Sequence, residues 1–364
     1  MSRNRIPEIC LLTLVAAGTL AFSLQTAAAQ PATTAPGLWV GSTRFIQEFQ
    51  GKALTKGGTP RASIRFESPA FFNPTSIAFD RHSNMWIGFG GAVIGNAPVL
   101  EITRAGVAAL RRGEAVKPAV ILRSKGAGQD PFETADSLAF DAAGDLWIAD
   151  GEQKGILEFL PQQIARNGAP APNILITSPD WIPHSMRFDA SDNLWVIRFL
   201  AGSGQVQICR FAPGDRAASG PSSPGLMLDL PIGQFFKDLA FDASGNLWTV
   251  GIDSNTEAVE MFSASDLSGA GVISPSPATT ITSFAFGGSF GSSCLNGVDF
   301  DPSGDLWISV GGANSGCDAA FQLVEFTPSQ LSTGGDLTPS IVIGQNHKKT
   351  NLLFPGPIKF GPKL

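Results

Sequence analysis

The chain contains no tyrosine, only three histidines and few charged residues, which make up 15% of the sequence. Its 25 basic side chains are outnumbered by 31 acidic ones, giving a formal net charge of −6. A partner held through its phosphate backbone requires a basic face. We therefore expect no nucleic-acid partner.

Long apolar runs are absent beyond the N-terminus, so no later segment is predicted to span a membrane. The N-terminus itself has Arg3 and Arg5, an apolar run from about Ile9 to Phe22, and three alanines before Gln30. This order is typical of a secretory signal peptide, and its apolar core is shorter than the roughly 20 residues of a span. We expect residues 1–29 to be a cleaved signal peptide and 30–364 to form one exported domain, periplasmic or secreted.

Two familiar catalytic patterns are also missing. The three histidines are scattered along the sequence, which gives a serine nucleophile paired with a histidine base no support. No cluster of His and Cys has the spacing of a zinc site.

What the chain does have is 41 glycines, 26 prolines and an internal repeat. Glycine and proline at these levels favour many short strands joined by turns. Each repeat has a strand ending in Phe-Asp, a short turn and a strand carrying Leu-Trp or Met-Trp. The Phe-Asp strands end at Asp80, Asp141, Asp189, Asp242 and Asp301, and the tryptophans are Trp86, Trp147, Trp195, Trp248 and Trp307. A third and a fourth strand follow each tryptophan strand, which predicts four-stranded propeller blades.

Two incomplete repeats remain at the ends of the chain. Leu38 to Phe49 supplies a tryptophan strand with no Phe-Asp strand before it, and Pro357 to Pro362 supplies a first strand with nothing after it. Joined, they complete a sixth blade and remove open sheet edges. The fold class predicted is all-β, a six-bladed β-propeller closed by pairing its two terminal segments.

The turns after the Phe-Asp strands contain Asp-x-x-Gly-Asp or Asp-x-x-Gly-Asn, as at Asp141–Asp145 and Asp242–Asn246. Such runs suggest calcium, but the pattern lacks the full ligand series of a calcium loop. Asp capping the turn amides and Gly supplying a positive φ explain the same spacing. We interpret these as turns, and the repeated tryptophans as packing between blades.

The Phe-Asp-x-x-Gly-Asn-Leu-Trp repeat, which covers nearly the whole mature chain, resembles the NHL-type propellers and the related gluconolactonase/senescence-marker (SMP-30-like) and virginiamycin B lyase-like propellers. The NHL-type resemblance implies a binding protein, and the gluconolactonase-like one implies a metal-dependent hydrolase of lactones. In that hydrolase family Glu, the Asn of Asn-Gly and the Asp of Asp-Gly hold the metal. Asn296-Gly297 matches the Asn-Gly element and Asp136 suits the Asp, although Ser137 rather than Gly follows it.

The predicted site is the channel mouth, which is normally the deep concavity of a propeller. The position four residues before each repeat phenylalanine enters this mouth, and we call these six residues the mouth ring: Thr75, Asp136, His184, Lys237, Asn296 and Gly356.

His184 is the candidate for acid/base catalysis, because imidazole titrates near neutrality. Trp181, Asp150 and Glu152 are expected nearby, with Trp181 as a stacking surface for a ligand. His184 and Glu152 only loosely match the acid/base pair of a virginiamycin lyase-like enzyme. Candidate metal ligands are Asn296 and Asp136, for a divalent cation such as calcium, but no cofactor is assigned.

Three cysteines remain after loss of Cys10 with the signal peptide. Cys294 and Cys317 lie in loops of one blade that open on the same face, which predicts a disulfide between them in an oxidising compartment. Cys209 lies inside a third strand and is expected to be a buried apolar residue.

The sequence leaves three functions open. The first is a monomeric, non-catalytic propeller that binds a small molecule or an envelope protein through its mouth loops. The second is a metal-dependent lactonase using the mouth ring. The third is a purely structural envelope protein whose mouth is plugged by its own loops.

Overall fold

The computed structural model describes residues 23–24, 36–43, 45–67, 73–90, 99–123, 132–152, 155–287, 294–311, 317, 321–344, 352 and 355–363. Apart from Ser23–Leu24, the expected signal peptide 1–29 lies outside these residues. Within the described part of the chain, no helix combines the length and apolarity needed to cross a membrane.

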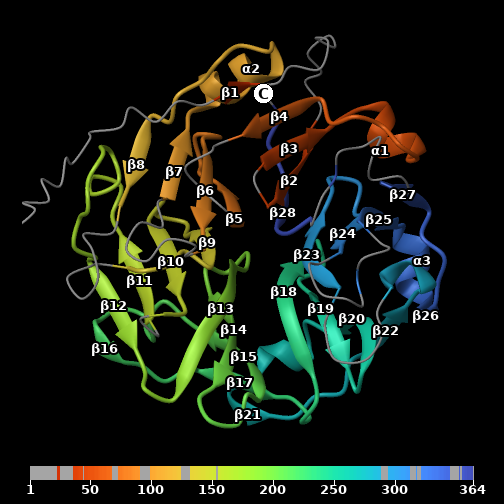
Figure 1. Cartoon of the computed structure of the whole chain (residues 1–364). Coiled ribbons are helices and arrows are strands. Elements are labelled where there is room, and N and C mark those ends of the chain that lie inside the picture. The colour runs from red at the N-terminus through yellow and green to blue at the C-terminus, as the bar shows by residue number, and fades with distance from the viewer. Residues whose placement is uncertain are drawn as a thin grey trace, which may run out of the picture.

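Six sheets stand around a central channel and form a six-bladed β-propeller, as Figure 1 shows, which confirms the predicted fold class. Blades 1 to 5 follow the chain and blade 6 combines its two ends. In that order, the innermost strands are β5 (Pro74–Phe79), β9 (Ser137–Phe140), β13 (Trp181–Phe188), β18 (Phe235–Phe241), β23 (Leu295–Phe300) and β28 (Ile358–Phe360).

The second strands carry the repeat tryptophans and the third strands follow them outward. In blade order, the second strands are β6 (Met85–Phe89), β10 (Leu146–Asp150), β14 (Leu194–Leu200), β19 (Leu247–Asp253), β24 (Leu306–Val310) and β2 (Leu38–Ser42). The third strands are β7 (Val99–Ile102), β11 (Gly155–Phe159), β15 (Val206–Phe211), β20 (Thr256–Phe262), β25 (Gln322–Phe326) and β3 (Phe45–Phe49).

The outermost strand of each blade is covered on its far side by chain from elsewhere. The fourth strands are β8 (Val120–Leu122), β12 (Ile174–Thr177), β17 (Leu226–Asp229), β22 (Thr279–Thr282), β27 (Ile341–Ile343) and β4 (Ile64–Glu67). Short strands from the following blade pair in parallel with β12, β17 and β22, and these are β16 (Gly220–Pro221), β21 (Gly271–Ile273) and β26 (Gly335–Asp336). β1 (Ser23–Leu24) pairs antiparallel with β4.

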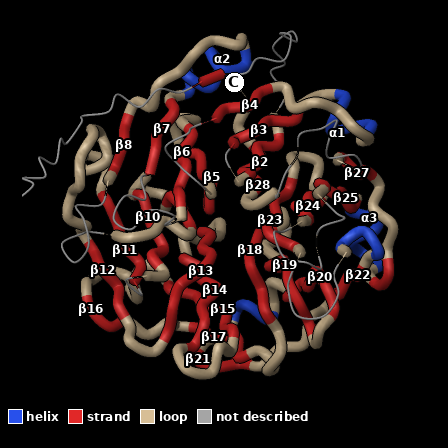
Figure 2. The backbone as a smooth tube through the Cα atoms, viewed as in Figure 1, coloured by secondary structure: helices blue, strands red, loops and turns tan. Residues whose placement is uncertain are grey.

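Helices are few and lie at the rim of the ring in Figure 2. Among the described residues these helices are α1 (Lys52–Lys56), α2 (Arg104–Arg111) and α3 (Pro328–Thr333). Two 3-10 turns are also present, at Asp266–Ser268 and Phe284–Phe286.

The two ends of the chain close the ring as the sequence predicted. β28 pairs antiparallel with β2, placing Val40 opposite Ile358 and Leu38 opposite Phe360. Ile358 is buried, so the joint adds apolar contact as well as backbone hydrogen bonds.

The repeat residues pack as interpreted from the sequence. Each repeat tryptophan from blades 1 to 5 contacts the Phe-Asp phenylalanine of the following blade edge to face, with ring centroids 5.7–6.2 Å apart. The Phe-Asp carboxylate caps its turn: Asp80 Oδ1 accepts the His82 and Asn84 amides, and Asp80 Oδ2 accepts Trp86 Nε1 at 3.2 Å. Turn capping and packing between blades therefore account for the residue pattern that recurs from blade to blade.

Candidate functional site

All six mouth-ring residues line one pocket of about 280 Å³ at the channel. Each lies in a different innermost strand or within two residues before it, so six distant segments meet there. Next to the ring, the same pocket is lined by Ser76, Ser137, Ser185 and Asp238, and by Arg187 and Phe235. The pocket is therefore small, polar and partly aromatic.

Shifts in strand register explain how two consecutive side chains of one innermost strand, such as Lys237 and Asp238, both reach the pocket. In four innermost strands the pairing register shifts by one residue, and the residue skipped is Thr75, His184, Lys237 or Asn296. Such a β-bulge turns a side chain away from its regular alternation. The sequence pattern located these positions, but the bulges that aim them were not predicted.

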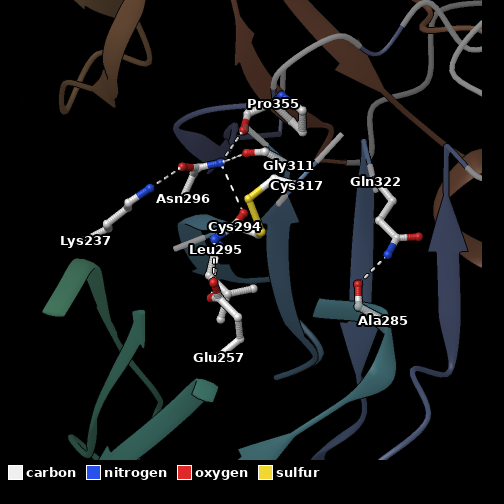
Figure 3. Close-up of a disulfide and its surroundings, with 10 residues drawn as sticks. All are labelled: Lys237, Glu257, Ala285, Cys294, Leu295, Asn296, Gly311, Cys317, Gln322 and Pro355. Carbon is white, nitrogen blue, oxygen red and sulfur yellow. Dashed lines mark hydrogen bonds between the residues drawn. A yellow bond between two sulfur atoms is a disulfide. The ribbon is translucent and has the colours of Figure 1, made fainter. Parts of the chain in front are cut away.

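Lys237 and Asn296 form a polar pair on neighbouring blades. Lys237 Nζ donates to Asn296 Oδ1 at 3.0 Å, and Asn296 Nδ2 donates to the carbonyls of Pro355, at 2.9 Å, and Gly311 (Figure 3). Burial lowers the pKa of Lys237, partly offset by the charge of Glu257. The amide of Asn296 thus fixes the position of the Lys237 ammonium group.

Asp136 is held by the loop after β10. Its Oδ2 accepts the Gly151 amide at 2.9 Å and the Thr134 hydroxyl at 3.2 Å. A Cβ at Gly151 would lie 2.5 Å from Asp136 Oδ2, so glycine is required for this contact. The pKa of Asp136 is raised to about 6. Burial is the main cause and the charges of Asp150 and Glu152 add to it, while the two hydrogen bonds act in the opposite direction.

His184 is a weaker base than the sequence suggested. Burial, followed by the charge of Lys237, lowers the pKa of His184 to about 4. Its ring lies 5.1 Å from that of Phe199, which stacks on Phe235 at 5.0 Å. At neutral pH His184 is therefore an uncharged hydrogen-bonding group beside Phe199, whereas Asp136, with a pKa of about 6, titrates near neutrality.

Three candidates near His184 do not have the expected roles. Trp181 is 4% exposed, packs against Phe211 and lies under the Arg198 guanidinium, so it offers no stacking surface to a ligand. Asp150 is completely buried and accepts the Thr134 hydroxyl at 2.9 Å, which makes it a loop-capping group.

Glu152 is exposed on the loop and does not line the pocket. The pairing of His184 with Glu152 as acid and base is therefore unsupported, because only His184 faces the pocket. The spacing of Glu152 from the repeat could not show on which side of its loop the carboxylate lies.

Below the mouth ring, a layer of side chains joins neighbouring blades. Ser and Asp side chains on one innermost strand accept backbone amides of the next: Ser76 from Leu138 at 2.9 Å, Ser137 from Met186 at 3.0 Å, Asp238 from Val298 at 3.1 Å and Asp299 from Phe360 at 2.7 Å. Sequence reasoning missed this layer. Its signal was present for Ser76, Ser137 and Asp238, each three residues before its repeat phenylalanine, whereas Asp299 lies directly before Phe300.

Charged groups deeper in the channel are paired with one another. Arg187 lies 3.3 Å from Asp238 and also donates to the Leu239 carbonyl at 3.0 Å, and Lys359 lies 2.7 Å from Asp299. The first ion pair joins blade 3 to blade 4, and the second joins blade 5 to blade 6. Neither basic residue was among the predicted site residues.

The predicted disulfide between Cys294 and Cys317 is present, with Cα atoms 5.5 Å apart (Figure 3). Glu257 accepts the Cys294 amide at 2.6 Å and so ties this bridge to blade 4. Cys209 is free and buried as expected, and burial raises the pKa of its thiol to about 12.

The proposed metal ligands are otherwise engaged. Asn296 Oδ1 accepts a hydrogen bond from the Lys237 ammonium group, which places a positive charge where a cation would bind. Within the described residues, three carboxylates that could hold a metal ion lie instead at the opposite end of blade 2, where oxygens of Asp141, Asp145 and Glu158 fall within 4.8 Å of one another. Arg216 lies 3.4 Å from Asp141 and balances part of this charge.

Comparison with known proteins supports the fold and gives no activity. No protein-family model and no curated protein matches the chain. A Bacteroides caccae protein of unknown function shares 13% identity, with a TM-score of 0.55 over 90% of this chain and 99% of its own. A Lactobacillus plantarum protein shares 11% identity, with a TM-score of 0.53 over 89% of this chain and 99% of its own.

A virginiamycin B lyase from Staphylococcus aureus is more distant. It shares 13% identity with a TM-score of 0.43, over 71% of this chain and 67% of its own. At these identities the shared feature is the fold. The fold and the comparisons therefore define the chain as a six-bladed β-propeller.

The shifted groups of the mouth predict opposite effects of pH on stability. The pKa of His184 is about 4 when folded, below its usual 6.5, so its contribution is present above pH 6.5 and is lost as pH falls toward 4. The pKa of Asp136 is about 6 when folded, above its usual 3.8, so its contribution is present below pH 3.8 and is lost as pH rises toward 6. Each slope is at most about 1.4 kcal/mol per pH unit.

We therefore compare unfolding free energies at about pH 4.5 and about pH 6.0, by urea titration. His184→Gln should reduce the increase in unfolding free energy between about pH 4.5 and about pH 6.0, by about 1–2 kcal/mol relative to the unchanged chain. Asp136→Asn should enlarge this increase by about the same amount. Shifts of the same sign in both variants would contradict this assignment.

Proposed function

We propose that this chain is a ligand-binding β-propeller whose channel-mouth pocket holds a small hydroxyl-bearing molecule, such as a sugar, a polyol or a sugar acid. The observation that carries the proposal is the convergence of the six mouth-ring residues on one pocket of about 280 Å³. Small-molecule sites are concave, largely pre-formed and provided with a few placed polar groups.

The chemistry of the pocket supports a hydroxyl-rich ligand. Asp136 offers a carboxylate acceptor, Lys237 an ammonium donor, and His184 a neutral ring with one donor and one acceptor nitrogen. Phe235, 38% exposed and backed by Phe199, supplies an apolar wall at the rim. Hydroxyl groups both donate and accept, so they match this mixed set better than a purely apolar ligand would.

Binding is tested by isothermal titration of the purified chain with a panel of monosaccharides, polyols and sugar acids. A ligand found in this way should bind at least about tenfold more weakly to Asp136→Asn and to Lys237→Met, because each loses a charged hydrogen-bonding group worth about 1.5–3 kcal/mol. Lys52→Met, on the exposed surface of α1, is the matched control and should bind normally. Equal affinity in all three variants would overturn the assignment of the pocket.

A lactone hydrolase is the second candidate, and one observation favours it. Asp136 lines the pocket with a pKa of about 6, suited to a general acid or base near neutral pH. The occupied oxygen of Asn296 weighs against the metal-dependent version of this activity. Hydrolysis of glucono-δ-lactone by the chain, lost in Asp136→Asn, would replace the binding proposal by the enzymatic one.

We propose further that the chain works outside the cytoplasm as a monomer. The Cys294–Cys317 disulfide is compatible with an oxidising compartment, and the N-terminal sequence pattern supports export. The partner in that compartment is proposed to be a small molecule rather than an envelope protein.

A further inference from the structure

A largely buried acidic cluster lies in blade 4, beside the mouth. Asp253 ends β19, Glu260 lies in β20, and Gln234 immediately precedes β18. Strand pairing sets Asp253 against Thr256 and Thr249 against Glu260, so the two carboxylates share one face of the sheet. Gln234 Nε2 reaches both, at 3.1 Å from Asp253 Oδ1 and 3.4 Å from Glu260 Oε1.

Gly251 permits this arrangement. It lies between Asp253 and Thr249 on β19, and a Cβ there would be 2.0 Å from the Phe235 carbonyl oxygen. Any larger residue at this position would push Phe235, at the start of β18, away from β19, and Gln234 would move with it. The close approach therefore places the Gln234 amide over the two carboxylates.

The cluster is deficient in positive charge and in hydrogen-bond donors. Glu260 is completely buried and Gln234 is 8% exposed, yet Glu260 Oε2 and Gln234 Oε1 have no hydrogen-bond partner among the described residues. Among the described residues, no Lys or Arg forms an ion pair with the carboxylate of Asp253 or Glu260. Burial and the charge of Asp253 raise the pKa of Glu260 to about 8. Two such carboxylates need a proton or a cation between them.

We propose that Asp253, Glu260 and Gln234 form a calcium site. They offer two carboxylates and, after rotation of the Gln234 side-chain amide, a third oxygen, and oxygen and nitrogen of such an amide exchange places by that rotation. Calcium accepts carboxylate and amide oxygens in flexible geometry and completes its shell with water. Asp253 is only half-buried and the next three residues are exposed, which gives an ion access from solvent.

The position of the site gives the ion a role at the mouth. Gln234 directly precedes Phe235, which lines the pocket and stacks on Phe199. A bound cation would hold the segment at Gln234 and so order the aromatic wall of the pocket. This role rests on the proposed binding function, whereas the metal site itself does not.

The test uses calcium alone on the full chain, first treated with a chelator, by isothermal titration and thermal melting at about pH 7.5. We expect one calcium ion per chain, a higher melting temperature with calcium, and at least about tenfold weaker binding in Asp253→Asn and Glu260→Gln. Glu325→Gln is the matched control, since Glu325 is also a buried carboxyl whose pKa burial raises, to about 7, but it lies in blade 5.

No calcium binding by the unchanged chain would overturn the proposal and leave a shared proton between the two carboxyl groups. Unchanged binding in both Asp253→Asn and Glu260→Gln would overturn it too, by placing the ion elsewhere, such as at Asp141, Asp145 and Glu158. If Glu260→Gln does not fold, the half-buried Asp253→Asn decides the question alone. The calcium titration contains no organic ligand, so its failure leaves the proposed binding pocket untouched. Failure of the sugar panel likewise leaves the proposed calcium site untouched.

Discussion

Removing residues 357–364 should abolish the folded ring. β28 would be lost, exposing the inner edge of β2 and the face of Trp307 that Phe360 covers with ring centroids 6.2 Å apart. The ion pair between Lys359 and Asp299 at 2.7 Å would disappear as well. Open sheet edges pair with other chains. We expect aggregates or large oligomers in size-exclusion chromatography and no cooperative thermal transition.

The control for this truncation removes only residues 362–364, which lie beyond β28. This shorter deletion keeps every backbone pair between β2 and β28 and should remain monomeric and cooperative. A monomeric 1–356 chain melting within about 5 °C of the full chain would show that the terminal strand is dispensable for closure.

Arg111→Met should destabilise the protein by about 3–5 kcal/mol near pH 8, the usual cost of leaving one partner of a buried ion pair alone. Arg111, in the last turn of α2, contacts Glu48 of β3 through two hydrogen bonds, of 2.5 and 3.1 Å. The side chains are 4% and 0% exposed. Burial raises the pKa of Glu48 even with Arg111 present, so the cost should shrink as pH falls and Glu48 takes up a proton.

Urea unfolding at two pH values measures this effect. The double variant Glu48→Gln with Arg111→Met removes the stranded charge and should recover most of the loss. Arg112→Met is the control, because Arg112 pairs with Glu114 on the surface, where both side chains are 54% exposed. Arg111→Met no more damaging than Arg112→Met would contradict a structural role for the buried pair.

The sequence determined the fold because the fold is a repeat. Every blade carries the same Phe-Asp and Leu-Trp strands, and the half-blades at the two ends complement each other, so strand count and ring closure could be read directly. The Cys294–Cys317 bridge followed from the same alignment, since equivalent loops of a blade open on the same face. The mouth ring was located by counting back from each phenylalanine, and all six positions line one pocket.

What each mouth residue can do was decided only by the tertiary structure. Whether His184 is charged depends on the Lys237 and Asp238 groups, which are far from it in sequence, and burial by neighbouring blades lowers its pKa. Trp181 is distinct in sequence, yet it packs against Phe211 and lies under Arg198, residues of the next two strands of its blade. The cluster of Gln234, Asp253 and Glu260 has no signature in the repeat. It exists because Gly251 lets the backbone at Phe235, on the neighbouring strand of the same blade, approach closely, and the local sequence pattern does not encode such a contact between strands.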